Sequence, residues 1–311
     1  MNLSDLREVM ARERLNACIF PCCGPHQCDH VAAHWKSCQW VSGFIGSGAT
    51  AVVTMTAAAL WVDACYAAAA ASQLAGTEFL LMKRNVDGTP TVSQWLGRQI
   101  NEARSPYSDW REVAIDGMCS SVNAVRALMS ELRAMGGITV RTNFDPLRRL
   151  WTDRPPIPSR LVSQQQPSSS VRDNLARIRQ ALRERHADGM LMASLDDTAW
   201  TLNLQATDAS GQPSFAGFLL IAPASVTFFV DRRHLSSGMA CYLHSEGVDV
   251  DDYVNVAAGL RSYFGYNMLL DPDEVSYTLY KTVVDNRQTV EGLKPAVKIM
   301  EEPSPVPRLR S

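Results

Sequence analysis

Cysteine and histidine side chains are concentrated in one short segment of the chain, between residues 22 and 38: Cys22, Cys23, His26, Cys28, His30, His34 and Cys38. On a helix, His26, His30 and His34 would share one face because four residues separate each from the next, and with a thiolate they could hold zinc tetrahedrally. Pro21 and Pro25 disfavour a helix at the start of this segment, and no C-x-x-C pair recurs at zinc-finger spacing. We therefore expect a loop of free thiols and solvated imidazoles. A metal-binding module on this loop is the weaker alternative.

Other groups of chemically capable residues have simpler explanations. The acidic stretch 244–252 lacks the D-x-D-x-D-G pattern of a calcium loop, which favours a solvated turn between a helix and a strand. Gly43, Gly46 and Gly48 follow the order G-x-x-G-x-G without a Gly-Lys-Ser/Thr, which indicates a tight turn rather than a phosphate loop. Cys65 follows an expected strand, but no sequence pattern supplies the base that a nucleophilic thiol needs. The sequence therefore predicts no catalytic residue and no metal ligand.

The elements that must position these residues occur in two copies. An amphipathic helix running into a short apolar strand begins near Leu3 and again near Val171. Each copy continues to two apolar runs, at residues 51–55 with 59–62 and at residues 217–221 with 226–230, and the second run of each pair closes on Val-Asp. Helices that alternate with strands indicate an α/β fold, so we expect two related domains, each a mixed sheet flanked by helices.

The expected domain boundaries follow composition. The first domain covers residues 1–152, a linker rich in Pro and Ser covers 153–170, the second domain covers 171–300, and the tail 301–311, with three prolines, should be disordered. Asp63 and Asp231, at the ends of the two matching strands, should cap the helices that follow them. Trp61 and Trp200 should belong to the core.

Overall composition excludes some classes of partner and place. The 311 residues carry 30 Lys and Arg against 32 Asp and Glu, so a formal net charge of -2 favours neither nucleic acid nor an anionic membrane. The N-terminus lacks the apolar core of a signal peptide, and the apolar run 49–62 is too short to span a bilayer. We expect a soluble, cytoplasmic protein whose eight cysteines are free thiols.

Several motifs carry a resemblance to a known family. They are the run S-G-F-I-G-S-G-A-T-A from residue 42, W-V-D-A-C-Y at 61–66, His26-Gln27, W-T-D-R-P at 151–155, and L-D-D-T-A-W-T-L-N-L at 195–204. In this order the chain resembles the two N-terminal domains of Xaa-Pro aminopeptidases of the aminopeptidase P type, in the creatinase family, up to about residue 300. The resemblance implies two tandem creatinase N-terminal-like domains. The family's third domain, which holds a pair of divalent metal ions, manganese by expectation, has no counterpart among these residues.

The resemblance also places candidate substrate-binding residues and shows departures from the family. His26, Asp63, Cys65 and Tyr66 occupy the positions that line the peptide in the family. The arginine of the family's D-G-R-Y motif corresponds to Cys65, and a thiol cannot replace a forked guanidinium. Three more family residues are replaced: an aspartate by Ile45, and the arginine and glycine of N-L-R-G by Gln205 and Ala206.

Three hypotheses follow for the function. The first is the noncatalytic N-terminal region of an Xaa-Pro aminopeptidase, a metallopeptidase that releases the residue before proline, with roles in dimerisation and substrate gating. The second is a stand-alone pseudoenzyme that forms a heterodimer with an active aminopeptidase P subunit and regulates it. The third is the metal-binding module of the Cys/His loop. The first two hypotheses imply a homodimer or heterodimer and proline-containing peptides, and neither of these two needs a cofactor in this chain.

Overall fold

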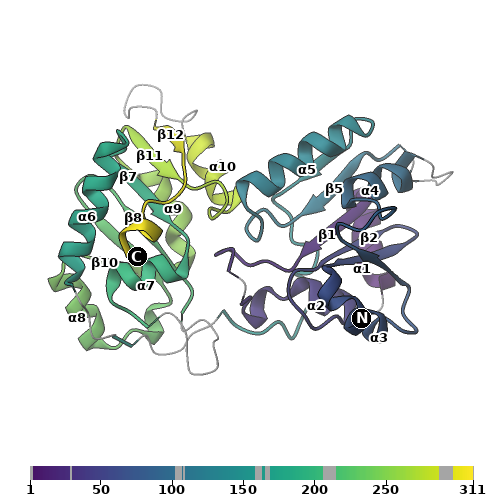
Figure 1. Cartoon of the computed structure of the whole chain (residues 1–311), viewed down its shortest axis with the longest axis horizontal. Coiled ribbons are helices and arrows are strands. Elements are labelled where there is room, and N and C mark those ends of the chain that lie inside the picture. Colours follow the sequence, from purple (N-terminus) through teal and green to yellow (C-terminus); the bar gives the residue numbers. More distant parts are fainter. Residues whose placement is uncertain are drawn as a thin grey trace. The chain divides into compact units, whose positions relative to one another are not determined.

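Two six-stranded sheets with the same strand order organise the computed structural model (Figure 1). The structure describes residues 3–28, 30–101, 107, 109–157, 163–164, 169–205, 215–286 and 297–310. The chain divides into two compact units: unit 1 comprises Met1–Gly24 and His34–Pro155, and unit 2 comprises Pro25–Ala33 and Pro156–Ser311. Pro25–Ala33 is called the excursion below, because it leaves unit 1 in sequence and belongs to unit 2.

Unit 1 is built on a mixed sheet of strand order β4-β3-β2-β1-β5-β6. Its strands are β1 (Ala17–Pro21), β2 (Thr50–Thr54), β3 (Ala58–Val62), β4 (Phe79–Lys83), β5 (Glu112–Ile115) and β6 (Thr139–Arg141). Its helices are α1 (Leu3–Glu13), α2 (Ser37–Ser42), α3 (Ala67–Gln73), α4 (Val92–Asn101) and α5 (Val122–Ala134), with 3₁₀ turns η1 (Ala33–Trp35) and η2 (Ala64–Tyr66). The strand pairs β1–β2 and β2–β3 are antiparallel, and the other three pairs are parallel.

Alternating side chains of the unit 1 strands give it three layers. Cys18 and Phe20 of β1 join one apolar cluster with residues of α1, α2 and α3. Ala17 and Ile19 of the same strand join a second cluster with residues of α4 and α5. Because successive strand residues point to opposite faces, the sheet lies between two helical layers.

Unit 2 repeats this plan with the order β10-β9-β8-β7-β11-β12 and the same pattern of parallel and antiparallel pairs. Its strands are β7 (Gly189–Met192), β8 (Gly217–Ile221), β9 (Val226–Val230), β10 (Asp249–Asp252), β11 (Asn267–Leu270) and β12 (Lys298–Glu301). Its helices are α6 (Val171–Glu184), α7 (Leu195–Leu202), α8 (Ser237–Ser245), α9 (Val256–Ser262), α10 (Tyr277–Asn286) and α11 (Val306–Arg310), with 3₁₀ turns η3 (Arg232–His234) and η4 (Tyr253–Asn255). The expected pair of α/β domains, each a mixed sheet flanked by helices, is confirmed.

Local sequence signals explain where the unit 2 helices begin and end. Ser170 and Asp173 form a capping box that begins α6, and the Ser194 hydroxyl accepts from the Asp197 backbone to begin α7. Asn203 ends α7 in the left-handed conformation at φ 54°, which asparagine tolerates better than most residues. Asp231 caps η3 as expected, because its side chain accepts from the Arg233 backbone.

The end of the chain differs from the expectation. The disorder predicted for residues 301–311 is wrong where the structure describes them, because β12 adds a sixth strand to the sheet and α11 follows it. Val306 is fully buried in the main apolar cluster of unit 2. Proline is tolerated here because Pro303 and Pro305 lie outside the strand ladder and Pro307 lies in the first turn of α11. Burial of apolar side chains therefore orders this segment, although its proline content alone predicts disorder.

Two further expectations need correction. The acidic stretch expected to be a solvated turn includes β10, an edge strand that pairs with β9 in parallel. Asp63 begins η2 without a side-chain capping bond, so its predicted capping role is wrong. The helices that the structure describes include none with the length and apolar character needed to cross a membrane.

Candidate functional site at the end of β3

Polar side chains from three parts of unit 1 meet where β3 ends. We call this group the β3-end site, and it comprises residues 45–48, residues 63–66 and Arg84. Strand β3 is buried along its whole length, whereas Asp63 directly after it is half-buried and Cys65 is exposed. The carboxylate of Asp63 pairs with the Arg84 guanidinium at 3.6 Å. The carboxylate of Asp63 and the thiol of Cys65 therefore lie at the surface, directly after the end of β3.

Arg84 ties this carboxylate to the loop before β2. Its Nη1 donates to the Gly48 carbonyl oxygen at 2.9 Å, and its Nη2 donates to Thr50 Oγ1 at 2.6 Å. Gly48 has φ 62°, and a Cβ there would lie 2.7 Å from Asp63 Oδ2. Glycine is favoured at this position because the backbone conformation strains other residues and a side chain would push the Asp63 carboxylate aside.

Tyr66 connects the turn after β3 to the same loop. Its hydroxyl lies 2.7 Å from Ser47 Oγ in a hydrogen bond that either oxygen can donate. On the other side of the loop, the Ile45 backbone N–H donates to Gln73 Oε1 at 2.7 Å. The Ile45 side chain is 67% exposed. The loop thus presents one apolar side chain on a framework of hydrogen bonds.

The predicted substrate-binding residues separate into two groups. Asp63, Cys65 and Tyr66 lie together at the β3-end site of unit 1, whereas His26 belongs to the excursion and therefore to unit 2. Within unit 2, His26 Nδ1 donates to the Ala193 carbonyl oxygen at 2.8 Å, and Nε2 lies 3.2 Å from the Tyr253 hydroxyl. The carbonyl can only accept, so Nδ1 carries the proton and Nε2 accepts from the tyrosine.

Burial fixes the charge state of His26. Its side chain is 4% exposed, and its ring centroid lies 4.5 Å from that of Phe218. Desolvation lowers the pKa of His26 to about 4, against a smaller opposite effect of the Ala193 hydrogen bond. The solvated imidazole that we expected is therefore wrong for His26, which anchors the excursion as a neutral ring. Its predicted part in substrate binding stays a prediction.

The Cys/His segment does not converge on a metal centre in the described residues, where no three Cys, His, Asp or Glu side chains are placed to hold an ion. His34 Nδ1 lies 2.6 Å from the Pro155 carbonyl oxygen within unit 1. The Cys28 thiol donates to the His30 carbonyl oxygen at 3.2 Å. All eight cysteines are free thiols. Three of the ligands proposed for zinc, His26, His34 and Cys28, thus have other partners.

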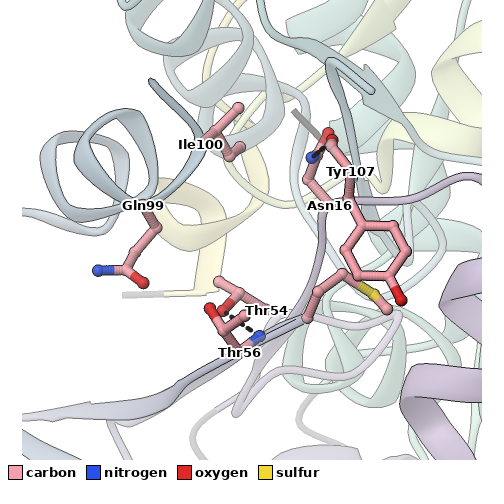
Figure 2. A pocket seen from close by; sticks show the side chains of 7 residues that line it. Asn16, Thr54, Thr56, Gln99, Ile100 and Tyr107 are labelled. Carbon is pink, nitrogen blue, oxygen red and sulfur yellow. Dashed lines mark hydrogen bonds between the residues drawn. The ribbon is translucent and has the colours of Figure 1, made fainter. Parts of the chain in front are cut away.

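A small pocket lies at the opposite end of the unit 1 strands (Figure 2). It has a volume of about 20 Å³ and is lined by Asn16, Thr54, Met55, Thr56, Gln99, Ile100 and Tyr107. Register places it away from the β3-end site, because Ala17 pairs with Thr54 at one end of the hairpin and Thr50 pairs with Trp61 at the other. A cavity of this size has room for about one water molecule, so it is no substrate pocket.

Comparison with known proteins identifies the family of the chain. The family model described as Creatinase/Prolidase N-terminal domain matches residues 153–310, which is half of the chain. The chain belongs to this family. The X-prolyl aminopeptidase of Caenorhabditis elegans, described as a cytosolic enzyme with a di-nuclear active site, has the same fold with a TM-score of 0.82 at 22% identity; the match covers 98% of this chain and 50% of that one.

Curated relatives of this chain are named Xaa-Pro aminopeptidase P or aminopeptidase P1. Aminopeptidase P1 of Lotus japonicus is 29% identical over 260 residues, or 82% of this chain and 38% of the relative. Aminopeptidase P1 of Arabidopsis thaliana is 29% identical over 259 residues, or 82% of this chain and 39% of the relative. The chain therefore spans about two fifths of the length of these relatives.

The W-T-D-R-P motif has a structural role in unit 1. Arg154 Nη1 pairs with Asp145 Oδ2 at 2.6 Å, and its Nε donates to the His34 carbonyl oxygen at 3.0 Å. The guanidinium also lies 5.0 Å from the centroid of the Trp151 ring. Arginine alone can make the planar stack and the forked bonds together. The motif therefore joins the end of unit 1 to the segments around Asp145 and His34.

The L-D-D-T-A-W-T-L-N-L motif likewise organises unit 2. Asp197 is 1% exposed; its Oδ2 accepts from the Ser304 hydroxyl at 3.3 Å, and its Oδ1 lies 3.5 Å from Arg310 Nε. Asn203 Nδ2 donates to the Ser169 carbonyl oxygen at 2.8 Å. Trp61 is core as expected, whereas Trp200 is only partly buried beneath Arg177. Gln205 bonds Ser163, while Ala206 lies outside the described residues.

Sequence reasoning missed two members of the β3-end site. Arg84 and Ser47 belong to it through the contacts given above. Ser47 lies within the S-G-F-I-G-S-G-A-T-A run but was not named as a binding residue, and Arg84 lies in none of the motifs. The available signal was the parallel pairing of β3 with β4, which brings Lys83 opposite Val62 and so places Arg84 beside Asp63. Only a correct pairing of two separate strands would have found it.

Proposed function

We propose that this chain forms the N-terminal region of an Xaa-Pro aminopeptidase of the aminopeptidase P type. The observation that carries the proposal is the 29% identity to the Lotus and Arabidopsis aminopeptidases P1 over 82% of this chain, together with the family match. The parent reaction is the metal-dependent release of an N-terminal residue before proline. The cytoplasm is the proposed location.

Within that enzyme the chain has a noncatalytic role. Hydrolysis in the parent enzyme uses a pair of divalent metal ions, manganese in our proposal, and the described residues offer no cluster able to hold them. The β3-end site supplies binding groups instead: a carboxylate paired with a guanidinium, a tyrosine hydroxyl and an exposed apolar side chain. We assign it to the wall of the substrate entrance, and we assign dimer contacts to the same region of the parent enzyme.

The first experiment measures hydrolysis. The purified chain, incubated with manganese and an Arg-Pro-Pro peptide, should release no arginine, while an intact aminopeptidase P assayed in parallel should release it. Release of arginine that survives further purification and is abolished by a chelator would contradict the noncatalytic role.

The second experiment tests the entrance wall. Cys65→Arg places a guanidinium at the exposed turn after β3, where it can fork onto a peptide carbonyl. We expect this variant to bind the Arg-Pro-Pro peptide several-fold more tightly than the unaltered chain, as measured by peptide-titrated NMR. Ala68→Arg, at an exposed position of α3, is the matched control and should leave binding unchanged. Equal binding by all three proteins would remove the β3-end site from the proposal.

A stand-alone pseudoenzyme is the second candidate function. The observation that favours it is that Ile45 and Cys65, which replace charged residues of the family pattern, are both exposed at the β3-end site. A tagged chain expressed in its source cells should capture an active aminopeptidase P subunit as a heterodimer and change its rate on proline peptides. Recovery of the tagged chain as a homodimer without peptidase activity would count against regulation.

A further inference from the structure

Strand β4 forms one edge of the unit 1 sheet. It stands at the end of the strand order, and its inner side pairs in parallel with β3. In the part of the chain that the structure describes, no strand pairs with its outer side. An edge strand presents a row of backbone donors and acceptors that can pair with a strand of another chain. The side chains of the strand decide whether such pairing is favoured.

The side chains of β4 do not protect its edge. Residues 79–82 are four consecutive apolar residues, and Leu80 among them is 53% exposed. The other edge strands of the two sheets carry charges: β10 has three aspartates, β6 has Arg141, and β12 has Lys298 and Glu301. Proteins use charged residues or proline to keep edge strands from unwanted pairing. Residues 79–82 contain neither, so the edge of β4 is suited to a partner strand.

The pairing of β4 with β3 fixes which of its backbone groups face outward. The Arg84 backbone N–H donates to the Val62 carbonyl oxygen at 2.8 Å. Backbone groups alternate between the two sides of a strand, so the even-numbered residues of β4 direct theirs to β3. Leu81 and Lys83 therefore direct their N–H and carbonyl groups to the outer side, where another strand can bond them.

We propose that the outer edge of β4 pairs with β4 of a second copy of this chain, antiparallel about a two-fold axis at Leu81. A two-fold axis perpendicular to the sheet makes the two edge strands antiparallel and joins the two sheets into one. Leu81 then lies opposite its own counterpart, and each donates its N–H to the carbonyl oxygen of the other. On one face of the joined sheet, the exposed Leu80 packs against Met82 of the second copy.

Charge complementarity selects this register. Glu78 directly precedes β4 and Arg84 directly follows it, so the register places Glu78 opposite Arg84 of the second copy, once on each side of the axis. Within one copy, Arg7 pairs with Glu78 at 2.7 Å, and Asp63 pairs with Arg84 at 3.6 Å. The dimer therefore lines up four charges of alternating sign. A shift of two residues in either direction places Glu78 opposite an apolar residue instead, which loses this pairing.

The β4 edge adjoins the β3-end site, because Arg84 takes part in both. The proposal gives a place to the dimer contacts of the proposed function, and to that extent it rests on that function. The assignment to an aminopeptidase P rests instead on sequence identity and the family match. A chain that stays monomeric would thus remove the β4 surface and leave that assignment standing.

Sedimentation of the full chain over a range of concentrations tests the pairing. The unaltered chain should form a dimer in equilibrium with the monomer. Leu80→Lys adds a charge to an exposed position of the edge and should weaken dimerisation by about tenfold or more. Val254→Lys makes a similar change at a 75% exposed position of unit 2 and, as the matched control, should dimerise like the unaltered chain. A monomeric unaltered chain, or equal dimerisation by the two variants, would overturn the proposal.

Two variants at one position test the register. Glu78→Gln removes the charge, whereas Glu78→Arg places a cation opposite Arg84 of the second copy. Both lose the ion pair with Arg7, so that loss cancels in the comparison. Glu78→Arg should dimerise several-fold more weakly than Glu78→Gln, and the difference should shrink at high salt, because salt screens exposed charges. Equal dimerisation of the two variants at low salt would rule out this register.

Hydrogen exchange of the unaltered chain gives a measurement that does not depend on the folding of a variant. The backbone amides of Leu81 and Lys83 should exchange several-fold more slowly as the chain dimerises, because they become hydrogen-bonded. The amides of β6, at the opposite edge of the same sheet, should keep a constant rate. Dimerisation without slower exchange at Leu81 and Lys83 would mean that the copies meet at another surface, and the proposal would be wrong.

Discussion

His26 Nδ1 donates to the carbonyl oxygen of Ala193 at 2.8 Å, although 167 positions separate the two residues in sequence. This bond, with the Tyr253 hydroxyl on the other ring nitrogen, holds the excursion within unit 2. His26, the first histidine of the Cys/His segment, thus has a structural role that residue types alone did not reveal. The physical reason is burial, because a ring removed from water must have both nitrogens satisfied.

His26 makes the stability of unit 2 dependent on pH. Its folded pKa of about 4 lies below the usual 6.5, so the unfolded chain binds more protons between these values and stability falls as pH drops from 6.5 towards 4. Between pH 7.5 and pH 5 the loss should be about 2 kcal/mol. Urea titrations should show a steeper pH dependence for the unaltered protein than for His26→Gln, whereas His30→Gln, at an exposed position of the excursion, should keep the full dependence.

Arg154 should tolerate no conservative replacement. Arg154→Lys keeps the charge but loses the forked bonds to Asp145 and the His34 carbonyl oxygen, and we expect a loss of about 2 kcal/mol in unfolding free energy. Arg149→Lys, at an exposed position of the same segment, should change stability by less than about 0.5 kcal/mol. Equal denaturation midpoints for the two variants would show that the Arg154 contacts do not stabilise unit 1.

Alanine substitutions at two glycines allow the cost of backbone strain to be measured apart from the cost of a steric clash. Gly43 and Gly48 both have positive φ, but a Cβ at Gly43 meets no atom within 4 Å, whereas one at Gly48 would lie 2.7 Å from Asp63 Oδ2. Gly43→Ala should cost about 1 kcal/mol of stability through strain alone. Gly48→Ala should cost more and displace Asp63 from Arg84, which thermal unfolding and the NMR shifts of the Arg84 side chain can detect.

The C-terminal helix α11 should stabilise unit 2 through Arg310. Arg310→Gln removes the cation 3.5 Å from buried Asp197, and we expect a loss of about 2 kcal/mol, below the roughly 3–5 kcal/mol of a fully buried pair because the Arg310 side chain is 37% exposed. Arg310→Lys should recover part of the loss. The midpoints of urea unfolding of the two variants and the unaltered protein at pH 7.5 measure this loss of stability.

The same variant should be less damaging in acid. Burial raises the pKa of Asp197, and burial with the nearby Asp197 and Asp271 charges raises the pKa of Glu274 to about 7. Groups with raised folded pKa values stabilise the fold more as pH falls, because the folded state then binds more protons. The difference in unfolding free energy between Arg310→Gln and the unaltered protein should therefore be smaller at pH 5 than at pH 7.5. A constant difference would mean that Arg310 acts only through packing.

The sequence by itself determined the α/β class, the duplication and the family. Helical periodicity, alternating apolar strands and the ordered motifs are local patterns, and each is written in neighbouring residues. The structure matches them with two sheets of the same strand order. The turn of Asp63, Cys65 and Tyr66 could be named as a candidate site for the same reason, since all three fall within one short motif.

Only the tertiary structure decided which distant residues meet. The pairing of β3 with β4 brings Arg84 to Asp63. The candidate turn with Asp63 belongs to unit 1, whereas the excursion places His26 in unit 2. The tail that its prolines marked as disordered is ordered as β12 and α11 because Val306 is buried and Arg310 faces Asp197. These outcomes depend on burial and on partners far away in sequence, which override local propensity and which no local pattern contains.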